Sequence, residues 1–189
     1  MILYTLQTDP VLASIDRLGY AHCKARYIEE KYGEMAPIFL TAYRWLAKEG
    51  ARYVAKPEGA ELFYWAFGCP GDIERFAGST LLTLDVPQGE ALLFRMEAWK
   101  RVLQLTLLGD DGELRDFRRE LAARGIAREQ DILLTGFYPD LRAAVLASWQ
   151  RLFCDQAEWQ REEIPEDIHL QAALWELRRE WIVHRERIG

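Results

Sequence analysis

The chain has 189 residues, half of them hydrophobic and 29% charged, which suits one globular domain with a substantial core and excludes a disordered chain. The formal net charge is −6 and the pI is about 5.2. This acidic balance argues against nucleic acid as a partner, because clustered Lys and Arg side chains supply most of the attraction to phosphates.

The first nineteen residues predict a strand followed by a helix. Residues 2–6 are apolar and aromatic with a threonine inside, a composition typical of a strand. Asp9 suits the N-cap of a helix, and Pro10 suits its first turn, where the missing N–H has no partner to lose. Gly19 suits the position just after a helix, since glycine adopts the left-handed conformation freely. We therefore expect a helix between Asp9 and Gly19.

The chain start lacks the basic and apolar regions of a secretory signal, and no apolar run is long enough to cross a bilayer. The three cysteines, Cys23, Cys69 and Cys154, are odd in number, and their spacing fits no metal or redox motif. We therefore expect free thiols, no metal site, no membrane partner and a cytoplasmic location.

The middle of the chain predicts helices and strands in alternation. We expect a short extended segment at 20–22, helices at 26–32 and 35–49, and an aromatic strand at 61–67. Residues 79–86 alternate with the period of a strand, and residues 91–94 continue after the turn 87–90. These two strands are expected to form a hairpin.

Helical periodicity dominates from residue 97 onward. We expect helices at 97–105, 113–124 and 140–153, and a strand at 181–188, whereas residues 168–177 fit either a helix or a strand. The predicted fold class is α+β, with a small mixed or antiparallel sheet and flanking helices. The expected organisation is a single domain over residues 1–189, with a helical insertion at 108–160.

Several residue groups have both a functional and a structural interpretation. The arginines of helix 113–124 alternate with acidic residues, which favours a solvated, salt-bridged surface over a phosphate grip. Tryptophans on helical faces are expected in the core, whereas Trp159 lies among polar residues and is expected to be exposed. His22 and Cys23 form the one candidate thiolate couple, beside the simpler interpretation of a free thiol. No nucleophile, phosphate-loop or zinc motif is present.

A series of motifs covers nearly the whole chain and resembles a known family. Its elements, in order, are Leu3–Thr8 with Gly19, Ala42–Trp45, Tyr64–Phe67, Leu84–Pro87, the stretch around Trp99, and Gln171-Ala172 with Trp175–Leu177. In this order they resemble a bacterial domain-of-unknown-function family, number 3841. That family carries no established activity, so the resemblance implies no reaction.

The opening and closing segments are also similar, more distantly, to proteins of the ADP-ribosyltransferase-like fold. That resemblance implies a nucleotide site at the end of the first strand. Thr5 stands where those proteins have a basic residue or histidine, and Gln171 stands where they have a glutamate. A glutamine cannot act as an anionic base, so the usual chemistry is in doubt unless another carboxylate replaces it. The sequence leaves Glu97, Glu166 and Glu176 open for that role.

Two functions follow from these observations. The first is a nucleotide-binding protein or degenerate enzyme, with a nucleotide or other small molecule in a cleft lined by Gln7, Thr8, Tyr43, Glu97 and Gln171. Thr8 and Asp9 have a simpler role as helix caps. The second function is a noncatalytic protein-interaction module that uses exposed aromatic residues. Cofactor and oligomeric state are left open.

Overall fold

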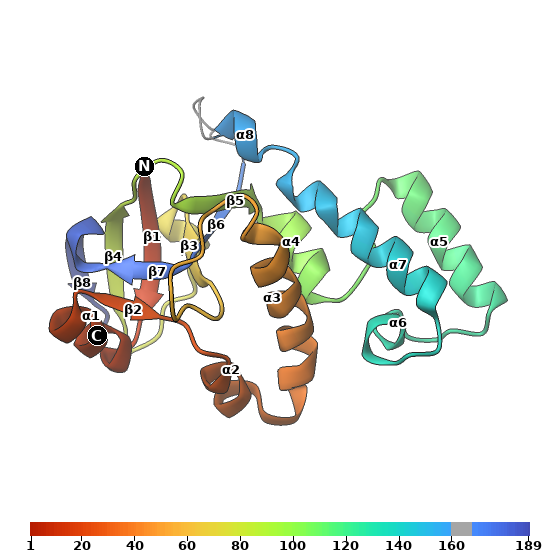
Figure 1. Ribbon diagram of the computed structural model, residues 1–189, viewed down its shortest axis with the longest axis horizontal. Coiled ribbons are helices and arrows are strands. Elements are labelled where there is room, and N and C mark those ends of the chain that lie inside the picture. Colours follow the sequence, from red (N-terminus) through yellow and green to blue (C-terminus); the bar gives the residue numbers. More distant parts are fainter. Residues whose placement is uncertain (160–167) are drawn as a thin grey trace.

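The computed structural model describes residues 1–159 and 168–189, and its fold is α+β, as predicted (Figure 1). Its main sheet is open and antiparallel, with the strand order β5-β6-β3-β1-β4-β8, and β2 and β7 form a separate antiparallel pair. The strands are β1 (Ile2–Gln7), β2 (Tyr20–His22), β3 (Tyr64–Phe67), β4 (Thr80–Asp85), β5 (Ala91–Arg95), β6 (Leu170–Leu174), β7 (Glu176–Arg178) and β8 (Ile182–Arg187).

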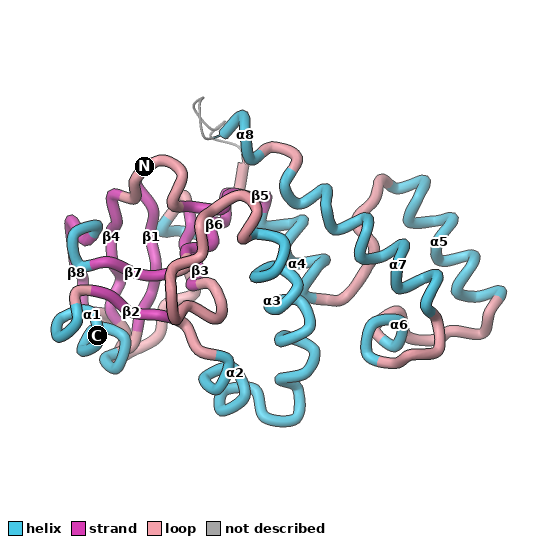
Figure 2. Tube along the Cα trace, in the orientation of Figure 1, coloured by secondary structure: helices cyan, strands magenta, loops and turns pink. Residues whose placement is uncertain are grey.

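The helices pack on both faces of the sheet, and most of them extend to one side of it (Figure 2). They are α1 (Asp9–Leu18), α2 (Ala25–Tyr32), α3 (Ala36–Gly50), α4 (Met96–Leu103), α5 (Asp111–Ala123), α6 (Asp131–Leu134), α7 (Pro139–Ser148) and α8 (Gln156–Trp159). Among the described residues, no helix combines the length and apolarity needed to cross a membrane.

The sheet separates two hydrophobic cores. One core packs α1 and the β2–β7 pair against a face that includes Leu3, Leu82 and Leu174. The other packs α3, α4 and the helices α5–α7 against a face that includes Leu92 and Phe94. Because side chains alternate across a strand, β3, β5 and β6 contribute to both cores.

Strand β1 has unequal neighbours, and this inequality positions the candidate site. It pairs with β4 along its whole length, from Ile2↔Asp85 to Gln7↔Thr80. With β3 it pairs only at Tyr4↔Phe67. The two strands therefore separate beyond Tyr4, toward the end of β1 that leads into α1.

The expected hairpin between residues 79–86 and 91–94 is wrong. β4 lies between β1 and β8, whereas β5 lies at the opposite edge of the sheet and pairs with β6. The turn between them is present, but it sends the chain across the sheet. The partners of β4 come from the two ends of the chain, and a local turn signal carries no information about such long-range pairing.

The predicted first helix is confirmed, but its cap differs from the expectation. Thr8 occupies the N-cap without a side-chain hydrogen bond, and Asp9 lies inside the helix, where its carboxylate pairs with Arg187. The Asp9 carboxylate therefore pairs with Arg187 of β8 instead of capping the helix. Gly19 has φ = 87°, so the helix ends at a left-handed glycine as predicted.

Other boundaries need smaller corrections. The aromatic strand is confined to Tyr64–Phe67, because Leu62 forms an isolated bridge to Cys23 instead. The helix expected at 140–153 ends at Ser148 and continues as the 3₁₀ turn Trp149–Phe153. The ambiguous segment 168–177 forms strands β6 and β7, and the strand expected at 181–188 is confirmed as β8.

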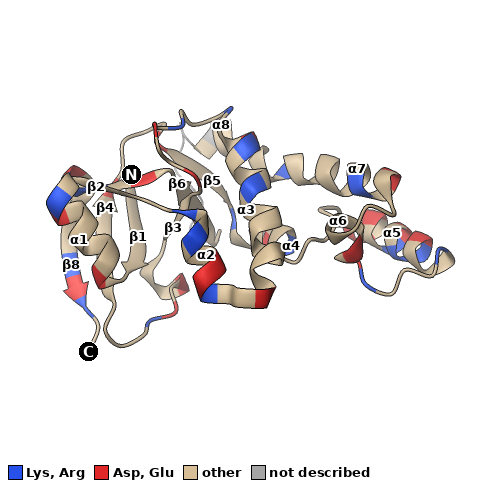
Figure 3. Ribbon diagram, turned by 60° about the horizontal axis from the view of Figure 1, so that its bottom comes forward, with Lys and Arg blue, Asp and Glu red and all other residues tan. Residues whose placement is uncertain are grey.

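The charged surface of α5 agrees with the sequence interpretation, and basic and acidic side chains alternate along this helix in Figure 3. Arg119 pairs with Asp116, and Arg124 pairs with both Glu120 and Asp140. These exposed pairs stabilise the surface modestly. Helices α5 to α7 lie beside the sheet, and the helical insertion expected at 108–160 stays a prediction.

The expectation that Trp159 is exposed is wrong. Trp159 is 4% exposed and packs in the core on the α1 side of the sheet, with the guanidinium of Arg95 above its ring. In the same helix, the Gln156 amide accepts from Leu93 N and donates to Ala91 O. This amide pairs with the backbone of β5, so α8 covers the sheet edge and buries its tryptophan.

Candidate functional site

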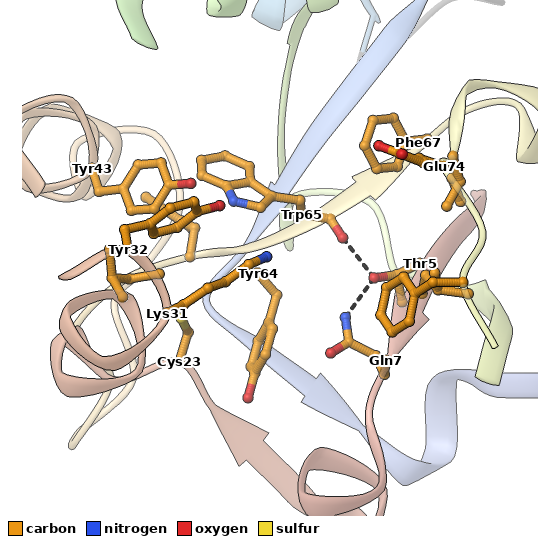
Figure 4. Close-up of a pocket in the computed structure, with 15 residues that line it drawn as sticks. Thr5, Gln7, Cys23, Lys31, Tyr32, Tyr43, Tyr64, Trp65, Phe67 and Glu74 are labelled. Atoms are coloured by element: carbon orange, nitrogen blue, oxygen red, sulfur yellow. Dashed lines mark hydrogen bonds between the residues drawn. The ribbon is translucent and has the colours of Figure 1, made fainter. Parts of the chain in front are cut away.

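A cavity of about 310 Å³ opens where β1 and β3 separate. Helix α2 and the segment 73–76 border it on opposite sides. Figure 4 shows Thr5 and Gln7 on one side, Tyr32 and Tyr43 on the other, and Trp65 between them. This volume is at the lower end of the range typical of small-molecule sites.

A chain of two hydrogen bonds fixes Gln7 at the end of β1. The Thr5 hydroxyl donates to the carbonyl oxygen of Trp65 at 2.6 Å, and Gln7 Nε2 donates to the same hydroxyl at 2.7 Å. Because the single hydroxyl proton goes to Trp65, the hydroxyl can only accept from Gln7. The amide orientation is thereby determined, and Gln7 Oε1 points away from Thr5 into the open space (Figure 4).

The wall opposite Gln7 is aromatic. The Tyr43 and Trp65 rings have centroids 5.1 Å apart, and Trp99 packs behind them at 6.0 and 4.8 Å. Tyr32 stacks on Phe39 at 4.0 Å. Burial raises the pKa of Tyr43, so its phenol stays neutral at physiological pH. This wall can accept a flat ring by stacking.

The mouth of the cavity carries opposite charges on its two walls. Lys31 of α2 extends along the Tyr32 ring, with its ammonium 5.1 Å from the centroid. Glu74 lies on the segment after β3, on the far side of Trp65 (Figure 4). Both side chains are exposed, so they can contact an anionic and a donor-bearing group of one ligand.

A second cavity of about 370 Å³ shares Cys23 and Tyr64 with the first. It lies between α1 and α2, and its lining includes Thr8, Ser14 and Glu30. Helix α2 therefore forms a wall of both cavities. The two cavities are adjacent, with the Cys23 and Tyr64 side chains as their shared lining.

The thiolate couple considered for His22 and Cys23 does not form. Burial, with a smaller effect of the Glu61 charge, raises the pKa of Cys23 to about 11, so the group is a thiol at neutral pH. His22 Nε2 lies 3.1 Å from Glu176 Oε2, and Arg178 bonds the other oxygen of that carboxylate. His22 is therefore directed toward β7 rather than toward the thiol. Cys23, Cys69 and Cys154 are all free, as expected.

The five predicted site residues lie in different places. Gln7 and Tyr43 line the first cavity together, and Thr8 lines the second. Glu97 lies on the exposed surface of α4, where it pairs with Lys100 at 2.7 Å. Gln171 is buried in β6 between Phe67 of β3 and Phe94 of β5, outside the lining of the first cavity.

The carboxylates considered as replacements also lie elsewhere. Glu176 is buried in β7, where its carboxylate contacts His22 of the neighbouring β2 and Arg178. Glu166 lies outside the described residues. Within the part of the chain that the structure describes, Glu74 is the carboxylate that lines the first cavity, and no group of histidine, cysteine and acidic residues is arranged to hold a metal ion.

Sequence reasoning did not select four residues of the cavity: Lys31, Tyr32, Trp65 and Glu74. Lys31 and Tyr32 lie at the end of an amphipathic helix, and their sequence pattern does not distinguish them from ordinary surface residues. Trp65 was recognised as part of an aromatic strand and of the family motif Tyr64–Phe67, and not as a site residue. The available signal was the aromatic composition of the helix around Tyr43 and of the strand around Trp65, because aromatic side chains tend to cluster.

The comparisons with known proteins give one result. No curated protein matches the chain, and no solved structure matches it. The sequence profile described as "Domain of unknown function (DUF3841)" matches residues 2–183. The match spans the sheet and the helices that border both cavities. The chain therefore belongs to the DUF3841 family.

Proposed function

We propose that this protein binds a nucleotide in the cavity between β1, β3 and α2. The observation that carries the proposal is the fixed amide of Gln7, whose acceptor oxygen faces an aromatic wall. A nucleobase has a flat ring for Tyr43 and Trp65, and N–H donors at its edge for Gln7 Oε1. Stacking on aromatic side chains contributes about 1–3 kcal/mol per base in single-stranded complexes.

The charges at the mouth support the same ligand class. Lys31 stands at the α2 side of the opening, where it can pair with a phosphate, and Glu74 stands opposite, where it can accept from ribose hydroxyls. We also propose a distant similarity to the ADP-ribosyltransferase-like fold, which would put the nucleotide at the end of the strand that carries Gln7. With Gln171 in the glutamate position, we propose a binding protein or degenerate enzyme.

The alternative of a protein-interaction module has less support. It was based on exposed aromatic residues such as Trp159, and the Trp159 side chain is buried. A bacterial cytoplasmic location remains part of the proposal, supported by the three free cysteines, which suit a reducing compartment.

Calorimetric titration with AMP, ADP-ribose and NAD⁺ tests the proposal. We expect at least one of these ligands to bind, and Gln7→Ala to weaken that binding about tenfold, the effect of one lost buried hydrogen bond. Gln88→Ala is the matched control, because Gln88 is exposed in the turn after β4 and lies outside the cavity. Absence of binding by all three ligands, or equal effects of the two substitutions, would contradict the proposal.

A further inference from the structure

The cavity wall opposite α2 is the segment 73–76, which little hydrophobic packing holds in place. Residues Ile73, Glu74 and Phe76 line the cavity, yet Glu74 is exposed and Phe76 is 53% exposed. Exposed side chains contribute little apolar burial to hold a segment in place. Its position therefore depends on the polar contacts at its two ends.

The far end of this segment is tied to the sheet. Gly78 N donates to Ile188 O at 3.1 Å, Ser79 Oγ donates to Phe76 O at 2.5 Å, and Arg75 pairs with Glu186 at 3.5 Å. These contacts connect the segment to β4 and β8. They leave the end next to β3 to be held by other groups.

The near end is the 3₁₀ turn Pro70–Asp72, and one side-chain contact ties this turn to a distant part of the chain. Asp72 Oδ1 lies 2.7 Å from His169 Nδ1, and the Asp72 side chain is only 10% exposed. Its other oxygen, Oδ2, is buried and has no hydrogen-bond partner among the described residues. A buried carboxylate with a single partner is costly to keep once that partner is removed.

The partner itself is firmly placed. His169 O accepts from Met96 N at 2.9 Å, and Leu170 O accepts from Gly68 N at 3.0 Å, so the backbone around His169 is bonded to α4 and to the end of β3. The imidazole is 64% exposed, so packing does not make it essential for folding. It acts on the segment through the Asp72 carboxylate.

We propose that Asp72 and His169 are a positioning pair, which holds the segment 70–76 as a wall of the ligand cavity. This inference rests on the proposed function for its effect on ligand binding. Loss of the imidazole frees Asp72 to turn toward water, and the segment with Ile73 and Glu74 then moves away from Trp65. Ligand affinity falls because one wall of the cavity is lost.

Trypsin cleavage after Arg75 reports the position of the segment without any ligand. We expect His169→Ala to speed this cleavage about tenfold, since local opening limits proteolysis of a held segment. His169→Asn, whose side-chain N–H can replace Nδ1, is expected to restore the wild-type rate within about twofold. Asp140→Ala, which breaks the Arg124 pair on distant α7, is the control and is expected to leave cleavage after Arg75 unchanged.

Nucleotide titration of the same variants tests the positioning role. His169→Ala is expected to lower the AMP affinity several-fold, and His169→Asn to restore it, with thermal unfolding near that of the wild type for both. Unchanged cleavage in His169→Ala, no rescue by asparagine, or unchanged affinity in a variant with rapid cleavage would each overturn the inference. If the wild type binds no nucleotide, the proposed function fails, and cleavage still decides whether the pair holds the segment.

Discussion

Replacing Thr5 by valine is expected to destabilise the protein by about 2–3 kcal/mol, because valine keeps the shape of threonine and removes both hydrogen bonds of its hydroxyl. The Thr5 side chain is 1% exposed, donates to Trp65 O at 2.6 Å and accepts from Gln7 Nε2 at 2.7 Å. The substitution leaves a carbonyl oxygen and an amide N–H without partners. Each such buried loss costs about 1–3 kcal/mol, and relaxation recovers part of it.

Urea unfolding followed by tryptophan fluorescence and circular dichroism measures this loss. Thr41→Val is the matched control, because the Thr41 hydroxyl only donates to Pro37 O on the more exposed surface of α3. We expect a change below about 0.5 kcal/mol for the control. In the background Gln7→Leu, the cost of Thr5→Val is expected to fall by about 1 kcal/mol, since one of the two bonds is already absent. A cost below about 0.5 kcal/mol for Thr5→Val in the wild type would refute the reasoning.

Three further predictions concern other parts of the chain. The first uses a C69S/C154S variant, in which Cys23 is the remaining cysteine. The pKa of Cys23 is raised to about 11 from 9.0, so its thiolate is about 100-fold scarcer at pH 8 than that of a free cysteine. Iodoacetamide is therefore expected to react far more slowly with Cys23 than with a free cysteine, and an equal rate would contradict this. The second concerns Glu113, whose pKa the Arg151 guanidinium lowers to about 2 from 4.5, so that the ion pair stabilises the fold fully above pH 4.5 and is lost as the pH falls toward 2. The stability of Glu113→Gln, measured by urea unfolding, is expected to depend less on pH in this window than that of the wild type. An unchanged pH dependence would argue against the pair. Gly50→Ala places a methyl group 2.9 Å from Leu92 Cδ2 and 3.0 Å from Phe63, and a loss of about 1–3 kcal/mol is expected in urea unfolding, with a neutral effect as the contrary result.

Local signals in the sequence predicted the elements whose boundaries depend on neighbouring residues. Gly19 ended α1 as expected, because a left-handed residue is a local requirement. The alternation of residues 79–86 predicted β4, but it could not identify β1 and β8 as its partners. Strand pairing is determined by long-range packing, and the turn at 87–90 therefore misled the hairpin prediction.

The candidate site was predictable only in part, for a related reason. Gln7 and Tyr43 were selected from their own segments, and the structure brings both to one cavity. The cavity exists because β3 pairs with β1 at one position only, which no local pattern encodes. Trp159 was misread because its polar neighbours gave no sign that Gln156 would bind the edge of β5.

The central claim is that a nucleotide binds beside Gln7 and Trp65, and amide NMR tests it most directly. We would follow the side-chain amide of Gln7, assigned with a Gln7→Leu variant, and the indole N–H signals during titration with AMP, ADP-ribose and NAD⁺. The prediction is that a binding ligand shifts the signals of Gln7 and Trp65, while that of Trp149, buried against Trp45 in the helical region, stays in place. Shifts confined to other tryptophans, or no shift at all, would contradict the claim.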